Sequence, residues 1–346
     1  MANHLCSPAV GIAPLRRCFF TPLVFFTVIG LFPPSIRPAV FGDYTVREVA
    51  PHTFLWLPDD IMDQNGDPQF SRAVNVGFII TSDGVVVIDT ANNPFHAREI
   101  LYEIRQRTDL PVRLVIDLGP QGDQMLGNEV FAEQRATIVS TAAAAREMRS
   151  YATSLRERMS YDSELQAHMR GIHFTLPTQT FQGDTKFRLG NEEILVTSLN
   201  CGTSGDAVAY LPRERVLFLG DFYVNGYVPE VGARNINRWI TALADLEKWN
   251  ATLFVPGHGA PDSRSGVANF RGFLEWLSAG VAGAIRQGET LSEAERQLLR
   301  SPAFNLRALE LAPGAIREVY EQFKHNQTAH AARREPPGAV AGNSGS

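Results

Sequence analysis

The chain has 346 residues, of which 44% are hydrophobic and 20% are charged. These proportions are ordinary for a globular protein with a sizeable core, and the length suits one large domain or two small ones. The formal net charge is −5 and no strong basic run is present, which argues against nucleic acid as a partner. Of three cysteines, only Cys201 lies outside the N-terminal leader, which excludes an internal disulfide or a cysteine-based zinc cluster in the mature domain.

The first 42 residues have the pattern of an export signal. Arg16 and Arg17 precede an apolar run that ends at Phe32. A basic segment followed by an apolar run of this length favours a secretory signal over a full membrane span or a buried helix of the domain. No clean cleavage site follows, so residues 1–42 are predicted to be a signal peptide or an uncleaved N-terminal anchor. We expect an exported protein, periplasmic or anchored in the inner membrane, with no other membrane contact.

The first half of the chain alternates between strand and helix patterns. It is predicted to contain, in order, a strand at 44–57, a polar loop at 62–71, a hairpin of strands at 74–80 and 85–88, an amphipathic helix at 96–107, a strand at 112–116, a helix at 128–134 and a strand at 136–140. The apolar strand at 112–116 is expected to be central in a sheet. One or two charged helices at 142–168 follow, an unusual length before the next strand.

The second half continues the alternation. It is predicted to contain a hairpin at 185–189 and 193–199, strands at 207–211 and 216–219, a helix at 236–248, a short strand at 253–255, and helices at 267–287, 291–299 and 315–324. Such alternation is typical of a layered α/β domain. The chain therefore divides into the leader at 1–42, a main domain at 43–265 with a helical insertion at 142–170, a C-terminal helical extension at 266–328, and a Pro/Gly/Ala/Ser-rich disordered tail at 329–346.

Four motifs stand at the ends of predicted strands. They are Gly84 to Thr90, Asp117 to Asn128, Cys201 to Asp206 with Gly220-Asp221, and Pro256 to Gly259. In order and spacing these motifs resemble the metallo-β-lactamase superfamily, over roughly residues 44–262. The branch that they resemble is the exported, glyoxalase-II-like hydrolases, including those encoded near quinoprotein dehydrogenases. The resemblance implies an α/β fold of four layers, an αββα sandwich, followed by C-terminal helices.

The metal-binding motif of that superfamily is incomplete in this chain. The signature loop of the family reads Asn-Thr-His-x-His-x-Asp-His-x-x-Gly-Asn, and Gly119, Gln121 and Gln124 stand at its three histidine positions. Gly202 replaces the mid-chain histidine that follows. In the family, the first two histidines and the mid-chain histidine hold one metal ion. Since glycine offers no donor and a glutamine amide is a weak neutral ligand, the resemblance implies that this half of the site does not hold zinc.

The second half of the motif keeps three of its four ligands. Asp123, Asp221 and His258 match family ligands, with Gln124 in the fourth place. Two carboxylates and one imidazole suffice for one divalent ion, with zinc as the expected metal and Gln121 and Gln124 as weak extra ligands. We therefore expect no metal ion or one per chain. Each residue also has a structural interpretation: Asp123 as a helix cap or first-turn acid, Asp221 as a loop brace, and His258 as a satisfied surface residue.

Three functions remain open on these residues. The favoured hypothesis is a non-classical or inactive homologue with a largely dismantled dinuclear zinc site, which binds a small molecule or a protein partner in the cleft. The alternative is a mononuclear hydrolase of esters, thioesters or lactones, in which Asp123 is both ligand and water-orienting group. The third is a structural or assembly role for the charged insertion. Cys201 is expected to be a buried hydrophobe, because no histidine near it in sequence would activate a thiol.

Overall fold

The structure is a computed structural model that describes residues 44–58, 73–199, 201 and 205–334. These residues all belong to one compact unit, which begins at Arg37. The predicted leader at 1–42, the predicted loop at 62–71 and Gly202 lie outside the described residues. None of the helices within the described ranges combines the length and the apolar character that a bilayer span needs.

The first sheet has seven strands in the order β1-β2-β3-β4-β5-β6-β7. They are β1 (Tyr44–Ala50), β2 (Thr53–Pro58), β3 (Val76–Ile80), β4 (Val85–Ile88), β5 (Val112–Ile116), β6 (Thr137–Thr141) and β7 (Gln179–Phe181). Strands β1 to β4 pair antiparallel, and β4 to β7 pair parallel. Every residue of β4 is buried, which explains why its sequence is an unbroken apolar run. The predicted hairpin of β3 and β4 and the central place of β5 are confirmed.

The prediction of a single strand over 44–57 is wrong. This segment is a hairpin, because β1 turns back at Pro51 and His52 and pairs antiparallel with β2. His52 has a φ of 60°, a left-handed conformation that breaks an extended strand. Proline contributes no backbone N–H to a strand ladder, so it also favours a turn at this point.

The second sheet has five strands in the order β12-β11-β10-β9-β8. They are β8 (Asp184–Leu189), β9 (Glu192–Ser198), β10 (Ala207–Leu211), β11 (Val216–Val224) and β12 (Leu253–His258). Strands β11 and β12 pair parallel, and the other neighbours pair antiparallel. Both β11 and β12 run past their predicted ends, to Val224 and His258. The two sheets face each other through one apolar core, and they approach so closely that a Cβ on Gly77 of β3 would overlap the ring of Phe218 of β11.

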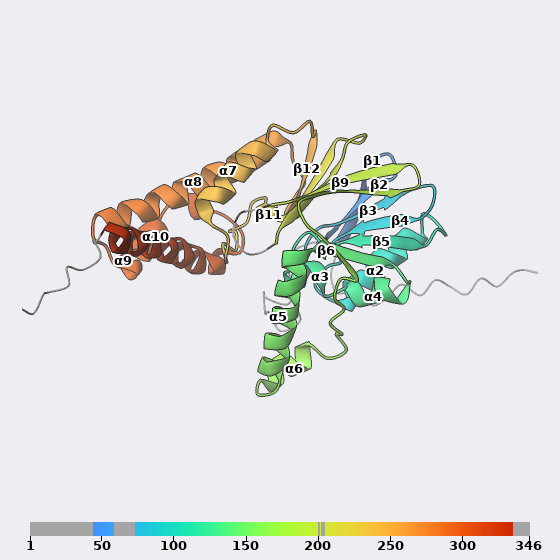
Figure 1. Cartoon of the computed structure of the whole chain (residues 1–346), viewed down its shortest axis with the longest axis horizontal. Coiled ribbons are helices and arrows are strands. Elements are labelled where there is room, and N and C mark those ends of the chain that lie inside the picture. Colours follow the sequence, from blue (N-terminus) through green and yellow to red (C-terminus); the bar gives the residue numbers. More distant parts are fainter. Residues whose placement is uncertain (1–43, 59–72, 200, 202–204, 335–346) are drawn as a thin grey trace, which may run out of the picture. The chain divides into compact units, whose positions relative to one another are not determined.

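Helices cover the outer faces of both sheets, so the predicted four-layer αββα architecture is confirmed (Figure 1). On the first sheet are α2 (Pro94–Arg105) and α4 (Asn128–Glu133), preceded by the short α3 (Gly122–Met125). The predicted insertion forms α5 (Ala142–Met159) and α6 (Ser163–His168). On the second sheet are α7 (Ile236–Leu246) and α8 (Arg264–Arg286). The helices α9 (Leu291–Leu298) and α10 (Ala312–Arg334) pack on α8, and 3-10 turns lie at Pro302–Phe304 and Leu309–Leu311.

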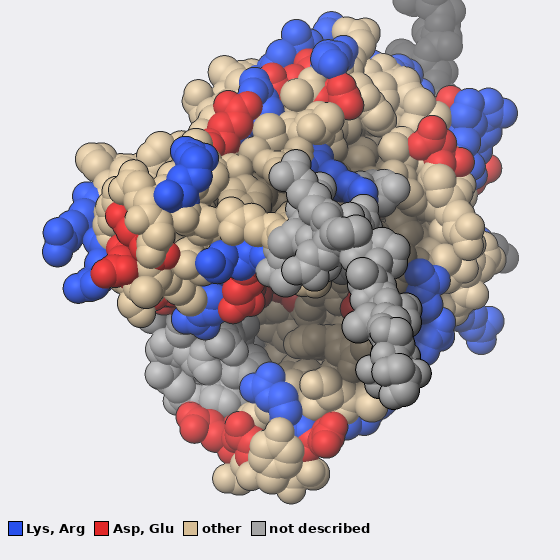
Figure 2. All heavy atoms as spheres, turned by 60° about the vertical axis from the view of Figure 1, so that its left-hand side comes forward, with Lys and Arg blue, Asp and Glu red and all other residues tan. Residues whose placement is uncertain are grey.

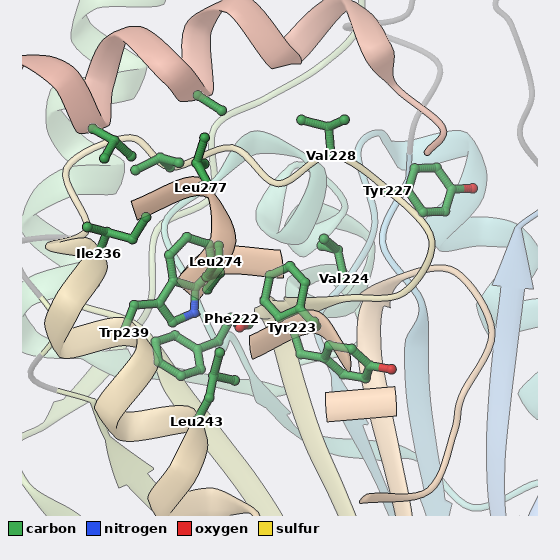
Figure 3. Packing of buried hydrophobic residues seen from close by; sticks show 14 of the residues in the cluster. Phe222, Tyr223, Val224, Tyr227, Val228, Ile236, Trp239, Leu243, Leu274 and Leu277 are labelled. Atoms are coloured by element: carbon green, nitrogen blue, oxygen red, sulfur yellow. Dashed lines mark hydrogen bonds between the residues drawn. The ribbon is translucent and has the colours of Figure 1, made fainter. Parts of the chain in front are cut away.

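The C-terminal helices share a core with the second sheet. Trp239 of α7 packs between Phe222 of β11 and Phe270 of α8, with ring centroids 5.7 and 5.6 Å away, and its indole N–H donates to the carbonyl of Phe222 at 2.8 Å. Figure 3 shows Leu274 and Leu277 of α8 beside this tryptophan. The predicted boundary at 265/266 therefore falls inside α8, and α10 continues past 329, where the tail was expected to begin.

Candidate functional site

Three side chains predicted from the sequence come from three separate elements and meet in one cluster. Asp123 comes from α3, Asp221 from β11 and His258 from the end of β12. Nε2 of His258 lies 3.1 Å from Oδ2 of Asp123 and 3.5 Å from Oδ1 of Asp221. One possible ligand atom from each residue lies within 4.8 Å of the other two. Their side chains are 24%, 14% and 15% exposed in the order given, so the cluster is half-buried and still open to solvent.

Two glycines bring Asp221 and His258 together. Gly220 has a φ of +51°, which interrupts the regular pairing of β11 with β12 and re-aims the residue that follows it. Gly257 lets β12 pass against Asp221, since a Cβ there would overlap Oδ1 and lie 2.8 Å from the backbone nitrogen of Asp221. The motif residues beside the candidate ligands are therefore small because two parallel strands and a carboxylate share this space.

Asp123 lies in the first turn of α3, where a negative charge is favourable. The N-cap of this four-residue helix is Gln121, whose side chain makes no capping hydrogen bond. The cap role considered for Asp123 is therefore wrong, whereas the first-turn position is confirmed. The next turn of the chain carries Met125 and Leu126, which are buried against Met148 of α5. The insertion thus fixes the helix that presents Asp123.

The surroundings of Asp221 disfavour the charged form of its carboxyl group. Burial raises its pKa to about 7, helped by the negative charge of Asp123, whereas His258 and Arg234 act in the opposite direction. Its buried Oδ1 has no hydrogen-bond partner among the described residues. An Asp that braced a loop would accept backbone N–H groups with this oxygen, so the structure gives no support to the bracing role. An unpartnered buried carboxylate oxygen is costly, and a bound cation would relieve that cost.

The two glutamines of the motif converge on Gly119. A Cβ on Gly119 would overlap Oε1 of Gln124 and lie 2.5 Å from Oε1 of Gln121. Both oxygens are buried and lack hydrogen-bond partners among the described residues. Nε2 of Gln124 donates to Oδ2 of Asp89 at 3.4 Å, which holds this amide in place. The glutamine side chains therefore fill the space that a side chain at position 119 would need, and their role as weak ligands stays a prediction.

Two further carboxyl groups lie behind the cluster, and each accepts hydrogen bonds from other residues of the domain. Asp89 is buried, and its Oδ1 accepts a hydrogen bond from the backbone N–H of Leu118 at 2.8 Å. Asp117 accepts from the Asn128 amide at 2.8 Å, and burial raises its pKa to about 8. Burial also raises the pKa of Asp89 well above its ordinary value. Through these hydrogen bonds the two acids join the ends of β4 and β5 to the loop that carries Asp123.

Sequence reasoning missed two residues beside the cluster. Tyr151 of α5 lies against the loop, because a Cβ on Gly122 would be 2.7 Å from its hydroxyl. Burial raises the pKa of Tyr151, and the negative charge of Asp123 adds to the effect. Arg234 is 3% exposed and forms a two-pronged ion pair with Asp206, at 2.8 and 2.9 Å. Neither residue belongs to a recognisable motif, so only the folded chain could identify them.

Cys201 has the surroundings of a buried hydrophobe. It is 3% exposed, and its thiol donates to the carbonyl of Arg238 at 3.7 Å. Burial raises its pKa to about 11, with a contribution from the negative charge of Asp206. A thiol with a raised pKa stays protonated at neutral pH and is a poor nucleophile.

Known proteins of this fold include hydrolases. No protein-family model matches the chain. Over 213 residues it is 21% identical to the linear primary-alkylsulfatase of Pseudomonas sp. (strain ATCC 19151), which covers 52% of this chain and 40% of that protein. A metallo-beta-lactamase from Pontibacter korlensis superposes with a TM-score of 0.53 at 19% identity, covering 67% of this chain and 99% of that chain. A stereoselective inverting sec-alkylsulfatase from Pseudomonas sp. superposes with a TM-score of 0.60 at 18% identity, covering 85% of this chain and 52% of that chain.

These likenesses define the class of protein. The chain has the metallo-β-lactamase fold, as its motifs indicated, with an Asp-Asp-His cluster whose residues come from α3, β11 and β12. It spans 40% of the primary-alkylsulfatase and 52% of the sec-alkylsulfatase. What those proteins act on is therefore a hypothesis for this chain.

Proposed function

We propose that the chain binds one divalent metal ion with Asp123, Asp221 and His258 and is a mononuclear hydrolase. The observation that carries the proposal is the buried Oδ1 of Asp221, which accepts no hydrogen bond from the described residues and lies 3.5 Å from Nε2 of His258. The donor set fits such an ion, because two carboxylates and one imidazole converge within 4.8 Å and three protein ligands leave room for a substrate. Zinc is the expected metal from the fold.

The residues of the cluster have different roles in the proposed hydrolysis. A divalent ion held here would act as a Lewis acid on an ester-type substrate. Asp123 is the most exposed of the three at 24%, so it is placed to orient an attacking water or to accept its proton. Asp221 and His258 are fixed by two paired strands and keep the site in one geometry. Candidate substrates are esters, thioesters and lactones, to which the alkylsulfatase relatives add sulfate esters.

A second candidate is a homologue that binds a ligand in the cleft without hydrolysing it. This candidate is favoured by the side chains of Gln121 and Gln124. They fill the space beside Gly119 in which a second metal ion would need an imidazole ligand. Without an ion, a protonated His258 lying between Asp123 and Asp221 would neutralise part of their charge. On this hypothesis the cluster is a remnant of a dismantled dinuclear site, and a small molecule or a protein is the partner.

Metal content separates the two candidates. We expect the protein purified without chelator, or titrated with Zn²⁺ or Mn²⁺, to hold about one ion per chain and to unfold at a higher temperature when loaded. His258→Ala should abolish this binding and any hydrolysis of p-nitrophenyl acetate or p-nitrophenyl sulfate. His325→Ala, an exposed histidine of α10, is the matched control. No binding by the wild type, with His258→Ala equally stable, would favour the second candidate. Two tightly held ions would contradict both.

We further propose that residues 1–42 direct the chain out of the cytoplasm, as a signal peptide or an anchor. The support is the Arg16-Arg17 pair before an apolar run. Fractionation of bacterial cells should find the domain in the periplasm or at the inner membrane. A full-length chain that stays soluble in the cytoplasm would contradict this proposal.

A further inference from the structure

The helical insertion is built onto the loop that carries Asp123. Met148 and Leu155 of α5 are buried in one small core with Met125 and Leu126, the residues that follow the cluster loop. The insertion therefore does not stand apart from the domain. It forms a wall beside the candidate site, and any side chain one turn along from Met148 on the same face lies next to α3.

Tyr151 is that side chain. Its hydroxyl lies against Gly122, and a Cβ on this glycine would be only 2.7 Å from it. The ring is held by an edge contact with Phe174, with centroids 6.3 Å apart. Tyr151 is 38% exposed, so solvent and a ligand can reach it, and its hydroxyl has no hydrogen-bond partner among the described residues. A phenol that is positioned by packing and left without a partner is available to a bound molecule.

The chemistry around this hydroxyl indicates which kind of molecule it suits. When they are ionised, Asp123 and Asp221 can only accept hydrogen bonds. They therefore donate no hydrogen bond to an ester bound near them. A phenol titrates near pH 10, so at neutral pH it is a neutral donor. Figure 2 shows that one face of the molecule is hollowed, with acidic and basic side chains mixed around the hollow rather than one sign alone. A neutral donor can form a hydrogen bond to a substrate oxygen, and this bond strengthens as negative charge develops on that oxygen.

We propose that Tyr151 is the substrate-contacting residue that the insertion supplies, with its hydroxyl donating a hydrogen bond to an oxygen of a carboxylic or sulfate ester held at Asp123, Asp221 and His258. This inference rests on the proposed hydrolase function. The hydrogen bond strengthens as negative charge develops on that oxygen during attack by water, so it lowers the barrier more than it tightens binding. The insertion thereby supplies a donor beside the loop in which Gly119 has no side chain.

Tyr151→Phe removes the hydroxyl and keeps the ring against Phe174. Tyr161→Phe is the matched control, since Tyr161 belongs to the same insertion and is 75% exposed. In metal-loaded protein, we expect Tyr151→Phe to bind Zn²⁺ like the wild type and to hydrolyse p-nitrophenyl acetate or p-nitrophenyl sulfate about tenfold more slowly. The loss should lie mainly in kcat rather than in KM. The control should stay within about twofold of the wild type.

The affinity for inorganic phosphate gives a second readout that needs no turnover. Phosphate is a tetrahedral oxyanion that accepts the same hydrogen bond, so its affinity for the metal-loaded protein should fall about fivefold in Tyr151→Phe and not in Tyr161→Phe. Unchanged rates and unchanged phosphate affinity in Tyr151→Phe, with metal bound, would overturn the role of Tyr151 alone. Absence of both turnover and phosphate binding in the metal-loaded wild type would overturn it as well. Failure of the wild type to bind metal would overturn the proposed function first.

Discussion

The buried ion pair of Arg234 with Asp206 should dominate the stability of the region beside the cluster. Arg234 is 3% exposed, donates to both carboxylate oxygens of Asp206 and lies with its guanidinium carbon 5.0 Å from the centre of the Trp239 ring. Asp206→Asn keeps the size of the side chain and removes its charge. The guanidinium is then left buried with a neutral partner, a situation that costs about 3–5 kcal/mol when one partner of a buried pair is removed.

A loss of this size is a large part of the roughly 5–15 kcal/mol that stabilises a typical domain. Equilibrium urea unfolding, followed by tryptophan fluorescence, would measure it as a lower midpoint with an unchanged slope. Asp245→Asn is the matched control, because the Lys248–Asp245 pair is 74% and 64% exposed, and such pairs contribute about 1 kcal/mol or less. Replacing both partners, as Asp206→Leu with Arg234→Met, should cost less than either single change. An Asp206→Asn loss below about 1 kcal/mol, or no larger than the control's, would refute the reasoning.

Three further predictions concern the site itself. In metal-free protein the folded-state pKa of Asp221, about 7, lies above the unfolded value, so the folded state binds the extra proton and stability should fall as pH rises from about 4 to 7. Asp221→Asn should make this fall in urea midpoints smaller, while the part caused by Asp89 and Asp117, whose pKa values burial also raises, should remain. Gly119→Ala should lower stability by about 1–3 kcal/mol, because its Cβ would overlap Oε1 of Gln124, and Gln124→Ala should restore most of the loss. Cys201 should not react with a chromogenic disulfide reagent in the native protein, since its pKa is raised to about 11, so wild type and Cys201→Ser should react alike.

Each of these predictions has a contradicting result. A flat pH dependence in the wild type, or the same slope in Asp221→Asn, would show that Asp221 does not govern the acid-side stability. A Gly119→Ala variant as stable as the wild type would mean that the glutamine side chains move aside freely. Faster labelling of the native wild type than of Cys201→Ser would show that the thiol is accessible.

Most of the fold could be predicted because its signals are local. The buried parallel strand Val85–Ile88 is an unbroken apolar run, and Val112–Ile116 is apolar except for Arg113. The hairpin at 44–58 was missed because its turn has no glycine, and His52 adopts the left-handed conformation instead. The ends of β11 and β12 were missed because polar and glycine residues of the motifs continue the strands.

The site was predicted where ligands stand in motifs and missed where they do not. Asp123, Asp221 and His258 converge as expected, because the fold brings the first turn of α3, the bulged part of β11 and the end of β12 together. Tyr151 lies in a helix whose charged sequence has no signal for a cleft residue, and it reaches the cluster only through tertiary packing. The structure also explains the glutamines in a way that spacing alone could not, since the approach of both side-chain oxygens to Gly119 depends on side-chain conformation.

The glutamine pair over Gly119 has a consequence for the order of evolutionary change. A histidine introduced first at position 119 would meet the oxygens of Gln121 and Gln124, so that substitution alone would be selected against through lost stability. Changes at 121 or 124 must come first, and by themselves they recover no imidazole at 119. The effect of each substitution therefore depends on which others are already present. Such dependence makes a full set of histidines at these three positions hard to reach one step at a time, and a library that varies the three positions together would be needed to find it.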